Sequence, residues 1–246
     1  MNLDKEMRLD KYLADMGKGT RSQLKEAARK GRIRVNGEVV KKADQKIRID
    51  VDAVEMDGVP VCYVTMEYYM LNKPQGVVSA TEDRKYETVI DLIEGKNRKD
   101  LFPVGRLDID TEGLLLITND GALAHNLLSP KKHVDKVYYA ICEGHVDDDV
   151  ICQFTDGIKL PDGLTCLPAK LEILKREEDE NGPYSEVHLT IREGKFHQVK
   201  RMMEAVGNPV RFLKRMTMGP LSLDPELPTG SYRALTDHEL ELLLNL

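Results

Sequence analysis

Two carboxylates and a guanidinium lie close together in residues 105–113, Gly-Arg-Leu-Asp-Ile-Asp-Thr-Glu-Gly, directly before the apolar stretch 114–118. Loops positioned by a rigid strand often carry catalytic groups, and an aspartate near an arginine stays ionised without a metal. Asp108 is therefore a candidate catalytic carboxylate. The same residue types also suit a turn in which aspartates cap backbone N–H groups. Residue types alone support both interpretations equally.

The cysteines offer no sign of a metal or redox site. Cys62, Cys142, Cys152 and Cys166 lack the close paired spacing of zinc ligands and are too few for a disulfide framework. We interpret them as reduced thiols that fill small apolar positions. We also find no Gly-rich phosphate loop and no nicotinamide fingerprint, so neither a metal nor another cofactor is expected.

The composition favours a globular protein, with 41% hydrophobic and 32% charged residues. No apolar run approaches the roughly 20 residues that span a bilayer, so no membrane span is expected. The N-terminal stretch is rich in charged residues, among them Asp4, Lys5, Glu6, Arg8 and Asp10. Such a stretch does not resemble a secretory signal, and we expect a cytoplasmic protein.

Charge is distributed unevenly along the chain. Residues 1–50 contain 14 Lys and Arg against 8 Asp and Glu, whereas the remaining residues contain 22 against 34. A basic end on an otherwise acidic protein predicts that one module meets a polyanion while the rest has another task.

The basic end reads as two short helices and a hairpin. One helical stripe is formed by Leu9, Tyr12, Leu13 and Met16. Gly17 and Gly19 end this helix, and Thr20 with Gln23 predicts a capping box for a second helix. The Asn-Gly pair within 33–40 predicts a tight hairpin, because both residues accept positive φ angles.

Residues 6–53 resemble the RNA-binding domain named after ribosomal small-subunit protein four. The resemblance rests on residues 8–13 (Arg-Leu-Asp-Lys-Tyr-Leu), 20–22, 31–33 and 35–37, in that order. It implies that cations on this module bind RNA. The candidates are Arg8, Lys18, Arg21, Lys25, Arg29 and Arg32. The alternative is a solvated basic face, which we consider less favoured for helices and hairpin in this order.

The remainder predicts an α+β domain. Residues 54–64 read as a linker ending in a turn, and 68–71 as a buried strand. Alternating apolar residues near 169–173 and 187–191 indicate half-exposed strands, so we expect a large mixed or antiparallel sheet. Helices are predicted at 122–128 and 197–206, and at the C-terminal end after a capping box of Thr236 with Glu239.

Four motifs resemble those of RsuA-type pseudouridine synthases. They are residues 71–79 (Leu-Asn-Lys-Pro-Gln-Gly-Val-Val-Ser), 105–121 (the segment around Asp108), 136–138 (Lys-Val-Tyr) and 193–202 (Glu-Gly-Lys-Phe-His-Gln-Val-Lys-Arg-Met). Their order matches this family along nearly the whole chain. The resemblance implies a pseudouridine synthase domain over residues 65–246, after an RNA-binding domain over residues 1–60.

What the resemblance implies is isomerisation of a uridine in ribosomal RNA, with 16S rRNA as the expected substrate. The nucleotide flips out of its stack, and the bond between ribose and uracil N1 is exchanged for one to C5. Asp108 matches the essential aspartate, acting at the ribose as a nucleophile or as a base; the sequence does not choose between them. Tyr138 matches the aromatic that stacks on the base, although an ordinary strand aromatic is the alternative.

Further roles follow from the same resemblance. Lys200 matches the basic partner of the catalytic carboxylate, with a solvated lysine as the alternative. Arg106 is expected to enter the vacated stack, contact phosphate or pair with Asp110. Lys73 and Arg215 are expected to contact phosphate at the rim. His197, in the same motif as Lys200, is interpreted as a structural or RNA-contacting residue rather than as a general base.

Two other functions remain open at this point. One is a synthase for 23S rRNA, whose relatives share the motifs; a long basic tail would favour it, and this chain ends soon after its last helix. The other is a non-catalytic RNA-binding assembly factor, which loss of Asp108 or Tyr138 would have indicated. The expected partner is structured ribosomal RNA or a ribosomal subunit precursor, bound by a monomer.

Overall fold

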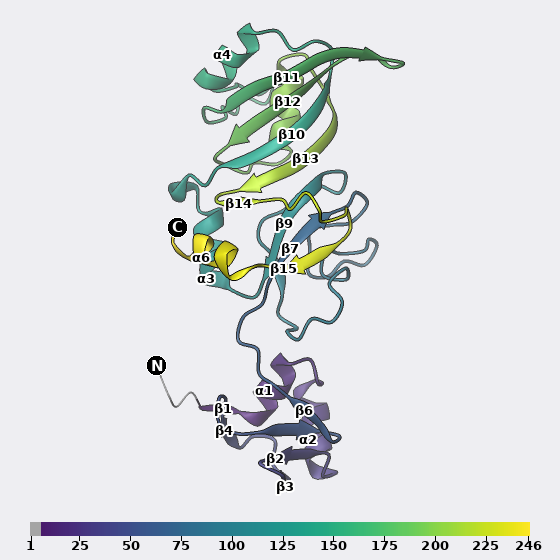
Figure 1. Cartoon of the computed structure of the whole chain (residues 1–246), viewed down its shortest axis with the longest axis vertical. Coiled ribbons are helices and arrows are strands. Elements are labelled where there is room, and N and C mark those ends of the chain that lie inside the picture. Colours follow the sequence, from purple (N-terminus) through teal and green to yellow (C-terminus); the bar gives the residue numbers. More distant parts are fainter. Residues whose placement is uncertain (1–5) are drawn as a thin grey trace. The chain divides into compact units, whose positions relative to one another are not determined.

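The computed structural model describes residues 6–246, and they form two compact units (Figure 1). The first unit consists of the chain up to Glu67 together with Glu94–Leu101, and the second of Tyr68–Ile93 and Phe102–Leu246. Asp4 and Lys5, which entered the prediction of a cytoplasmic protein, lie outside the described residues.

The helices of the first unit form as their sequence predicts. Helix α1 (Leu9–Asp15) buries Leu9, Tyr12 and Leu13, and α2 (Arg21–Arg29) buries Leu24, Ala27 and Ala28. Both predicted hydrogen bonds of the capping box between Thr20 and Gln23 are present. These side chains share one hydrophobic core with the strands of the unit.

The strands of the first unit form two small sheets. Strands β1 (Glu6–Arg8) and β4 (Lys46–Arg48) pair with each other. The other sheet has the order β3 (Glu38–Val39), β2 (Ile33–Val35), β5 (Val54–Met56) and β6 (Val59–Val61). The hairpin at Asn36-Gly37 is confirmed, since both residues have positive φ. The predicted linker is wrong over β5 and β6, because Val54 and Val61 fill the core as paired strands.

Residues 94–101 belong to the first unit although the sequence placed them in the catalytic domain. Arg98 explains this assignment. Its guanidinium is buried and bonds to the Tyr63 hydroxyl, the Val64 carbonyl and the Asp100 carboxylate. Backbone N–H groups of this segment also donate to Glu67. A buried guanidinium needs several acceptors, and these come from the first unit.

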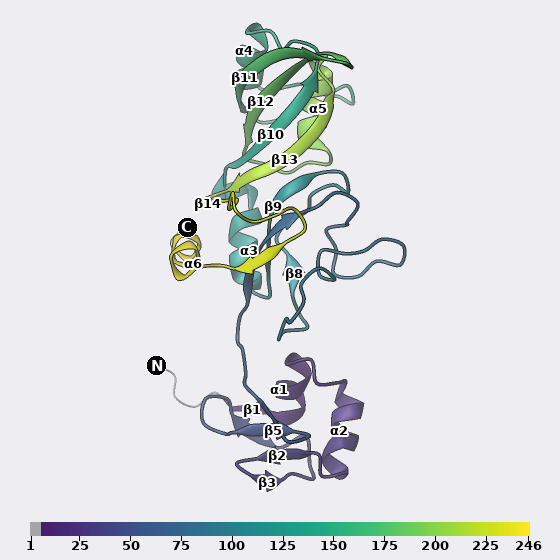
Figure 2. The same ribbon diagram turned by 45° about the vertical axis from the view of Figure 1, so that its right-hand side comes forward.

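The second unit is built on one nine-stranded sheet. Its main path runs β11-β12-β10-β13-β9-β7-β15 (Figure 1), with β14 beside β13 and β8 beside β9 (Figure 2). The strands are β7 (Tyr68–Lys73), β8 (Phe102–Pro103), β9 (Glu112–Thr118), β10 (Lys136–Glu143), β11 (Lys170–Asp179), β12 (Gly182–Ile191), β13 (Val210–Met218), β14 (Leu221–Ser222) and β15 (Tyr232–Ala234). The predicted α+β fold with a large mixed sheet is confirmed.

Helices cover the ends and faces of this sheet. They are α3 (Gly121–Leu128), α4 (Asp149–Asp156), α5 (Gln198–Ala205), α6 (Asp237–Leu244) and the short 3-10 turn η1 (Pro130–Lys132). Three of these helices were predicted, including the capping box that starts α6. Helix α4 was missed; its buried Val150 and Phe154, four residues apart, were the available signal.

A single parallel contact joins the two halves of the sheet, where β13 meets β9. Gly113 faces Arg215 there with φ of 102°, and a Cβ on this glycine would lie 2.3 Å from the Arg215 carbonyl oxygen. Only glycine fits at so close an approach. The second glycine of the motif at 105–113 therefore allows the seam that brings the Asp108 loop beside β13 and β10.

Candidate active site

A pocket of about 720 Å³ opens in the second unit beside this seam. All four motifs contribute to its wall, through Ser79, Asp108, Tyr138 and the segment 193–197, although they are far apart in the sequence. Arg215 of β13 completes the lining. A pocket of this size can enclose one nucleoside.

Lys73 holds the loop that carries Asp108. Its Nζ donates to the carbonyl oxygens of Pro74, Asp108 and Thr111, each at 3.0 Å. Burial lowers the pKa of Lys73 to about 8, although nearby carboxylates, Asp108 first, oppose this effect. In this structure the fully buried Lys73 ammonium faces backbone carbonyls, rather than the rim at which a phosphate contact was expected.

The same motif braces the loop at two further points. The Ser79 hydroxyl donates to the Leu107 carbonyl at 2.9 Å and accepts from the Leu107 N–H at 3.0 Å. The Gly76 N–H donates to the Ile109 carbonyl at 2.8 Å. Residues 71–79 therefore clamp the backbone on both sides of Asp108, which limits the positions that its carboxylate can take.

The Asp108 carboxylate faces two side chains of the closing motif. Lys200 Nζ lies 3.4 Å from Asp108 Oδ2, and His197 Nε2 lies 3.5 Å from Oδ1. Lys200 also donates to Asp110 Oδ1 at 2.5 Å. Partial burial is the largest single effect and opposes ionisation of Asp110, but the hydrogen bond from Lys200, its charge and smaller favourable effects together lower the pKa of that carboxyl. One ammonium thus serves both aspartates of the loop.

His197 occupies an unusual backbone position directly before α5. Its φ of 47° is left-handed, and its ring stacks on Phe196 with centroids 3.8 Å apart. Phe196 is 71% exposed at the pocket. Sequence reasoning did not anticipate that His197 approaches Asp108, because a regular helix over 197–206 would have pointed the ring elsewhere.

The pocket floor consists of three side chains on one face of the sheet. Lys136 and Tyr138 lie two residues apart on β10, and Arg215 is directly opposite Tyr138 on β13. They are only 7%, 8% and 2% exposed, respectively. Arg215, which was expected at the rim, therefore lies on the floor. Tyr139 faces the other side of the sheet, where its ring packs against Phe212.

Arg106 stands at the mouth of the pocket with its side chain exposed. Within residues 6–246 its guanidinium forms neither an ion pair nor a hydrogen bond. The ion pair with Asp110 considered for it is not formed, since Asp110 is held by Lys200. The Arg106 side chain is therefore available to a ligand.

The comparison with known proteins identifies the family of the chain. Residues 67–205, more than half of the chain, match the family model described as RNA pseudouridylate synthase. The chain belongs to this family. The synthase is 47% identical over 238 residues to an uncharacterised RNA pseudouridine synthase of Bacillus subtilis, with 96% of this chain and 98% of that protein covered.

Further relatives cover nearly all of the synthase. Ribosomal small subunit pseudouridine synthase A of Escherichia coli is 40% identical over 236 residues, which is 95% of this chain and 98% of that protein. A crystal structure of a pseudouridylate synthase is 38% identical and aligns with a TM-score of 0.65 over 96% of this chain and 99% of that one. Residues 7–51 match the S4 domain model, so both resemblances seen in the sequence are confirmed.

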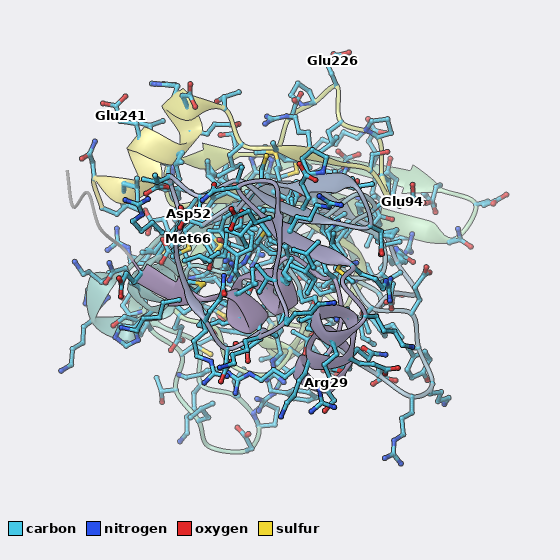
Figure 3. All side chains as sticks on the ribbon, turned by 90° about the horizontal axis from the view of Figure 1, so that it is seen from below. Arg29, Asp52, Met66, Glu94, Glu226 and Glu241 are labelled. Carbon is cyan, nitrogen blue, oxygen red and sulfur yellow. The ribbon has the colours of Figure 1, made fainter. Side chains whose placement is uncertain are left out.

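The S4 domain of the synthase carries its predicted cations on two separate surfaces. A depression of about 530 Å³ is lined by Arg8, Arg21, Lys25, Arg29, Lys41 and Lys42 (Figure 3 labels Arg29). Lys18 and Arg32 line a different depression. Arg32 there forms two hydrogen bonds with Asp57, at 2.6 and 2.5 Å. Lys41 and Lys42 were missed, because their loop shows no helical repeat.

Two further properties of the described part of the chain concern metal-binding clusters and membrane-spanning helices. Among residues 6–246 no group of three or more His, Cys, Asp and Glu side chains is arranged to hold a metal ion. None of the helices in this part combines the length and apolar character required to cross a bilayer.

Proposed function

We propose that the synthase isomerises one specific uridine of 16S ribosomal RNA. The support is its 40% identity, over nearly the whole of both chains, to a protein named ribosomal small subunit pseudouridine synthase A. A ribosomal substrate fits a basic S4 domain joined to an acidic catalytic unit, and it assigns the enzyme to the cytoplasm. We also propose that the enzyme works as a monomer.

The observation that carries the proposed chemistry is the position of Asp108. Its carboxylate lies on the wall of a pocket that also contains the Tyr138 ring, and Lys200 lies 3.4 Å away. A nearby ammonium favours the ionised form of a carboxylate and orients it. Asp108 then acts at the ribose, either by attack on C1′ or by removal of the 2′ proton.

The target uridine reaches this pocket by flipping out of its RNA stack. Tyr138 is almost entirely buried, so a base that is still stacked in a helix cannot touch its ring. The flat ring holds uracil by its face and leaves it free to turn between the two bonding arrangements. Arg106, exposed at the mouth, is suited to fill the vacated stack or to contact the adjacent phosphate.

Pseudouridine mapping in ribosomal RNA from cells with and without the gene tests this proposal. We expect one 16S site to lose its pseudouridine, and to regain it with the wild-type gene but not with Asp108→Asn. A lost site in 23S rRNA would show that the target is wrong. If no site were lost and Asp108→Asn restored subunit assembly, a non-catalytic assembly role would replace the enzymatic one.

A further inference from the structure

Two cations lie side by side on the pocket floor without a carboxylate partner. Lys136 Nζ donates to the Val134 carbonyl at 3.1 Å, and Arg215 Nε donates to the Leu114 carbonyl at 2.7 Å. Arg215 Nη2 is buried and has no hydrogen-bond partner in the described chain. Buried side-chain donors are normally satisfied, so an unpartnered guanidinium nitrogen at a pocket indicates a missing acceptor.

The nearby carboxylates have other partners. Asp108 faces Lys200 and His197, while Glu193 pairs with Lys195 and accepts from Gln198. Asp135, the residue before Lys136, pairs with Arg192. Burial first and the Arg215 charge second lower the pKa of Lys136, with Asp135 opposing. The floor therefore has positive charge that the protein itself leaves unbalanced.

The depth of these cations indicates which part of a flipped nucleotide they meet. The phosphodiester of a flipped nucleotide remains joined to the RNA on both sides, so it stays at the mouth while the base enters first. Arg215 is opposite Tyr138 on the neighbouring strand, hence beside any base that stacks on that ring. The edge of the base, rather than a phosphate, therefore faces Lys136 and Arg215.

We propose that Arg215 and Lys136 bind an exocyclic oxygen of the target uracil and stabilise the negative charge that the base acquires when it leaves the ribose. The proposal rests on the synthase acting through Asp108 as described above. When that oxygen is O4, the contact also selects uracil. Both cations only donate hydrogen bonds, so they match the carbonyl oxygen at C4 and oppose the amino group that cytosine carries there.

The charge arises because the C1′–N1 bond breaks with its electron pair remaining on N1. Uracil leaves as a monoanion whose charge is shared by N1 and both exocyclic oxygens, while C1′ bonds to Asp108 or forms a double bond to C2′ after Asp108 takes the 2′ proton. After the base turns, C5 bonds to C1′ as Asp108 is released or returns its proton. C5 then loses its proton and N1 gains one. Donors fixed in a dry site stabilise such charge strongly.

The test measures single-turnover rates at saturating enzyme on 16S rRNA transcripts made with uridine or with 5-fluorouridine, followed as loss of the N1-linked target nucleoside after nuclease digestion. This readout serves both transcripts, because a C5 that carries fluorine has no proton to lose and the fluorinated base cannot complete the last step. The variants of the full chain are Arg215→Gln, Arg215→Lys and Lys136→Met. Fluorine withdraws electrons and makes uracil a better leaving group, so it reduces the need for stabilising cations. The matched control is Lys214→Gln, since Lys214 neighbours Arg215 on β13 and faces the other side of the sheet.

We expect Arg215→Gln to slow uridine conversion on the order of a hundredfold, and Lys136→Met less. Arg215→Lys is expected to retain part of the rate. The loss should shrink several-fold on fluorinated RNA, while RNA affinity and Tm stay close to the Lys214→Gln values. Lys136→Met keeps the test valid if Arg215 variants fold poorly, since this substitution removes only one hydrogen bond, the one from Lys136 to the Val134 carbonyl.

Equal losses on both transcripts would overturn the proposal and indicate that Arg215 only supports the seam. Weaker RNA binding with an unchanged saturating rate would overturn it in favour of a phosphate contact. Failure of the proposed function gives a different result. The wild-type enzyme would then form pseudouridine in 23S rRNA instead of 16S rRNA, or in neither of these two RNAs. In the former case the same variants are measured on 23S rRNA.

Discussion

Lys200 Nζ lies 3.4 Å from Asp108 Oδ2, which links helix α5 to the loop before β9. The two residues are distant in sequence. Because Lys200 also hydrogen-bonds Asp110, the ammonium sits between two carboxylates of one loop. This arrangement separates a carboxylate directed at the pocket from one that anchors the lysine, and the two can be tested independently.

Asp108→Asn is expected to reduce pseudouridine formation on the order of a hundredfold or more, with Tm and RNA affinity nearly unchanged. A half-buried loop carboxylate adds little to the core, but its loss removes the nucleophile or base. Tritium release from 5-tritiated uridine RNA measures the rate. Asp110→Asn is the matched control and should retain much more activity, since it does not line the pocket. A tenth of wild-type turnover in Asp108→Asn would contradict the assignment.

Lys200→Met is expected to slow turnover roughly tenfold to a hundredfold, with RNA affinity less affected, because Asp108 loses its counter-charge. Lys200→Arg should recover much of the rate, since a guanidinium can pair with both aspartates. Single-turnover kinetics and melting curves of the two variants provide the readout. A Lys200→Arg variant as slow as Lys200→Met would mean that the positive charge beside Asp108 does not support the rate.

Because the pKa of Lys73 is lowered to about 8, we expect a loss of activity above pH 8 that is not caused by unfolding. Its pKa in the folded chain is about 8, below its ordinary value of 10.5. Deprotonation leaves two N–H donors for three carbonyls, so the Asp108 loop loosens. Between these two values the unfolded chain binds more protons, and the Lys73 contribution to stability therefore becomes more favourable as pH rises.

Rate profiles and melting curves over pH 6.5–9.5 check this expectation. Lys73→Met should be slower at every pH and lack the alkaline limb that Lys73 causes. It should also lose about 2 kcal/mol of stability, because three carbonyls lose a charged donor. If the limb persists in Lys73→Met, another group or the RNA itself is responsible.

Tyr138→Phe is expected to keep the fold and appreciable RNA binding, whereas Tyr138→Ala should lose most activity with a modest loss of stability. A ring against a flipped base contributes roughly 1 to 3 kcal/mol through its face, which Phe retains. A bound but unproductive Tyr138→Phe would implicate the phenol oxygen in proton transfer. Melting temperature, affinity and turnover are compared together. An unfolded Tyr138→Ala beside a fully active Tyr138→Phe would assign the ring to the core.

The S4 domain should dominate the salt dependence of RNA binding. Replacing Arg21, Lys25 and Arg29 together by Gln in the full chain should lower the slope of log K against log salt by about 2 to 2.7, through lost counterion release. The equal charge change at Lys18, Lys30 and Arg32 is the control. It should have a smaller effect, because Lys30 and Arg32 are already paired with Glu26 and Asp57. Equal effects would mean that RNA contacts both surfaces.

The local elements were predictable because their causes are local. The capping boxes at Thr20 and Thr236, the Asn36-Gly37 hairpin and the alternating strands near Leu189 depend on residues within a few positions of each other. The strands β5 and β6 were missed because their causes are not local. Their short apolar pattern gains stability only by pairing with β2 and by burying Val54 and Val61.

The sequence by itself determined the fold class, the family and Asp108 as the candidate carboxylate, because those depend on the kinds of residues and their order. The tertiary structure decided the direction in which each basic side chain points. It turned Lys73 inward onto three carbonyls, brought His197 to Asp108 and placed Arg215 on the floor beside Tyr138. Residue type does not decide this, because lysine and arginine occur both at surfaces and in cavities. Contacts between distant segments decide it, among them the β9–β13 seam, which Gly113 permits and which brings the Asp108 loop beside Arg215.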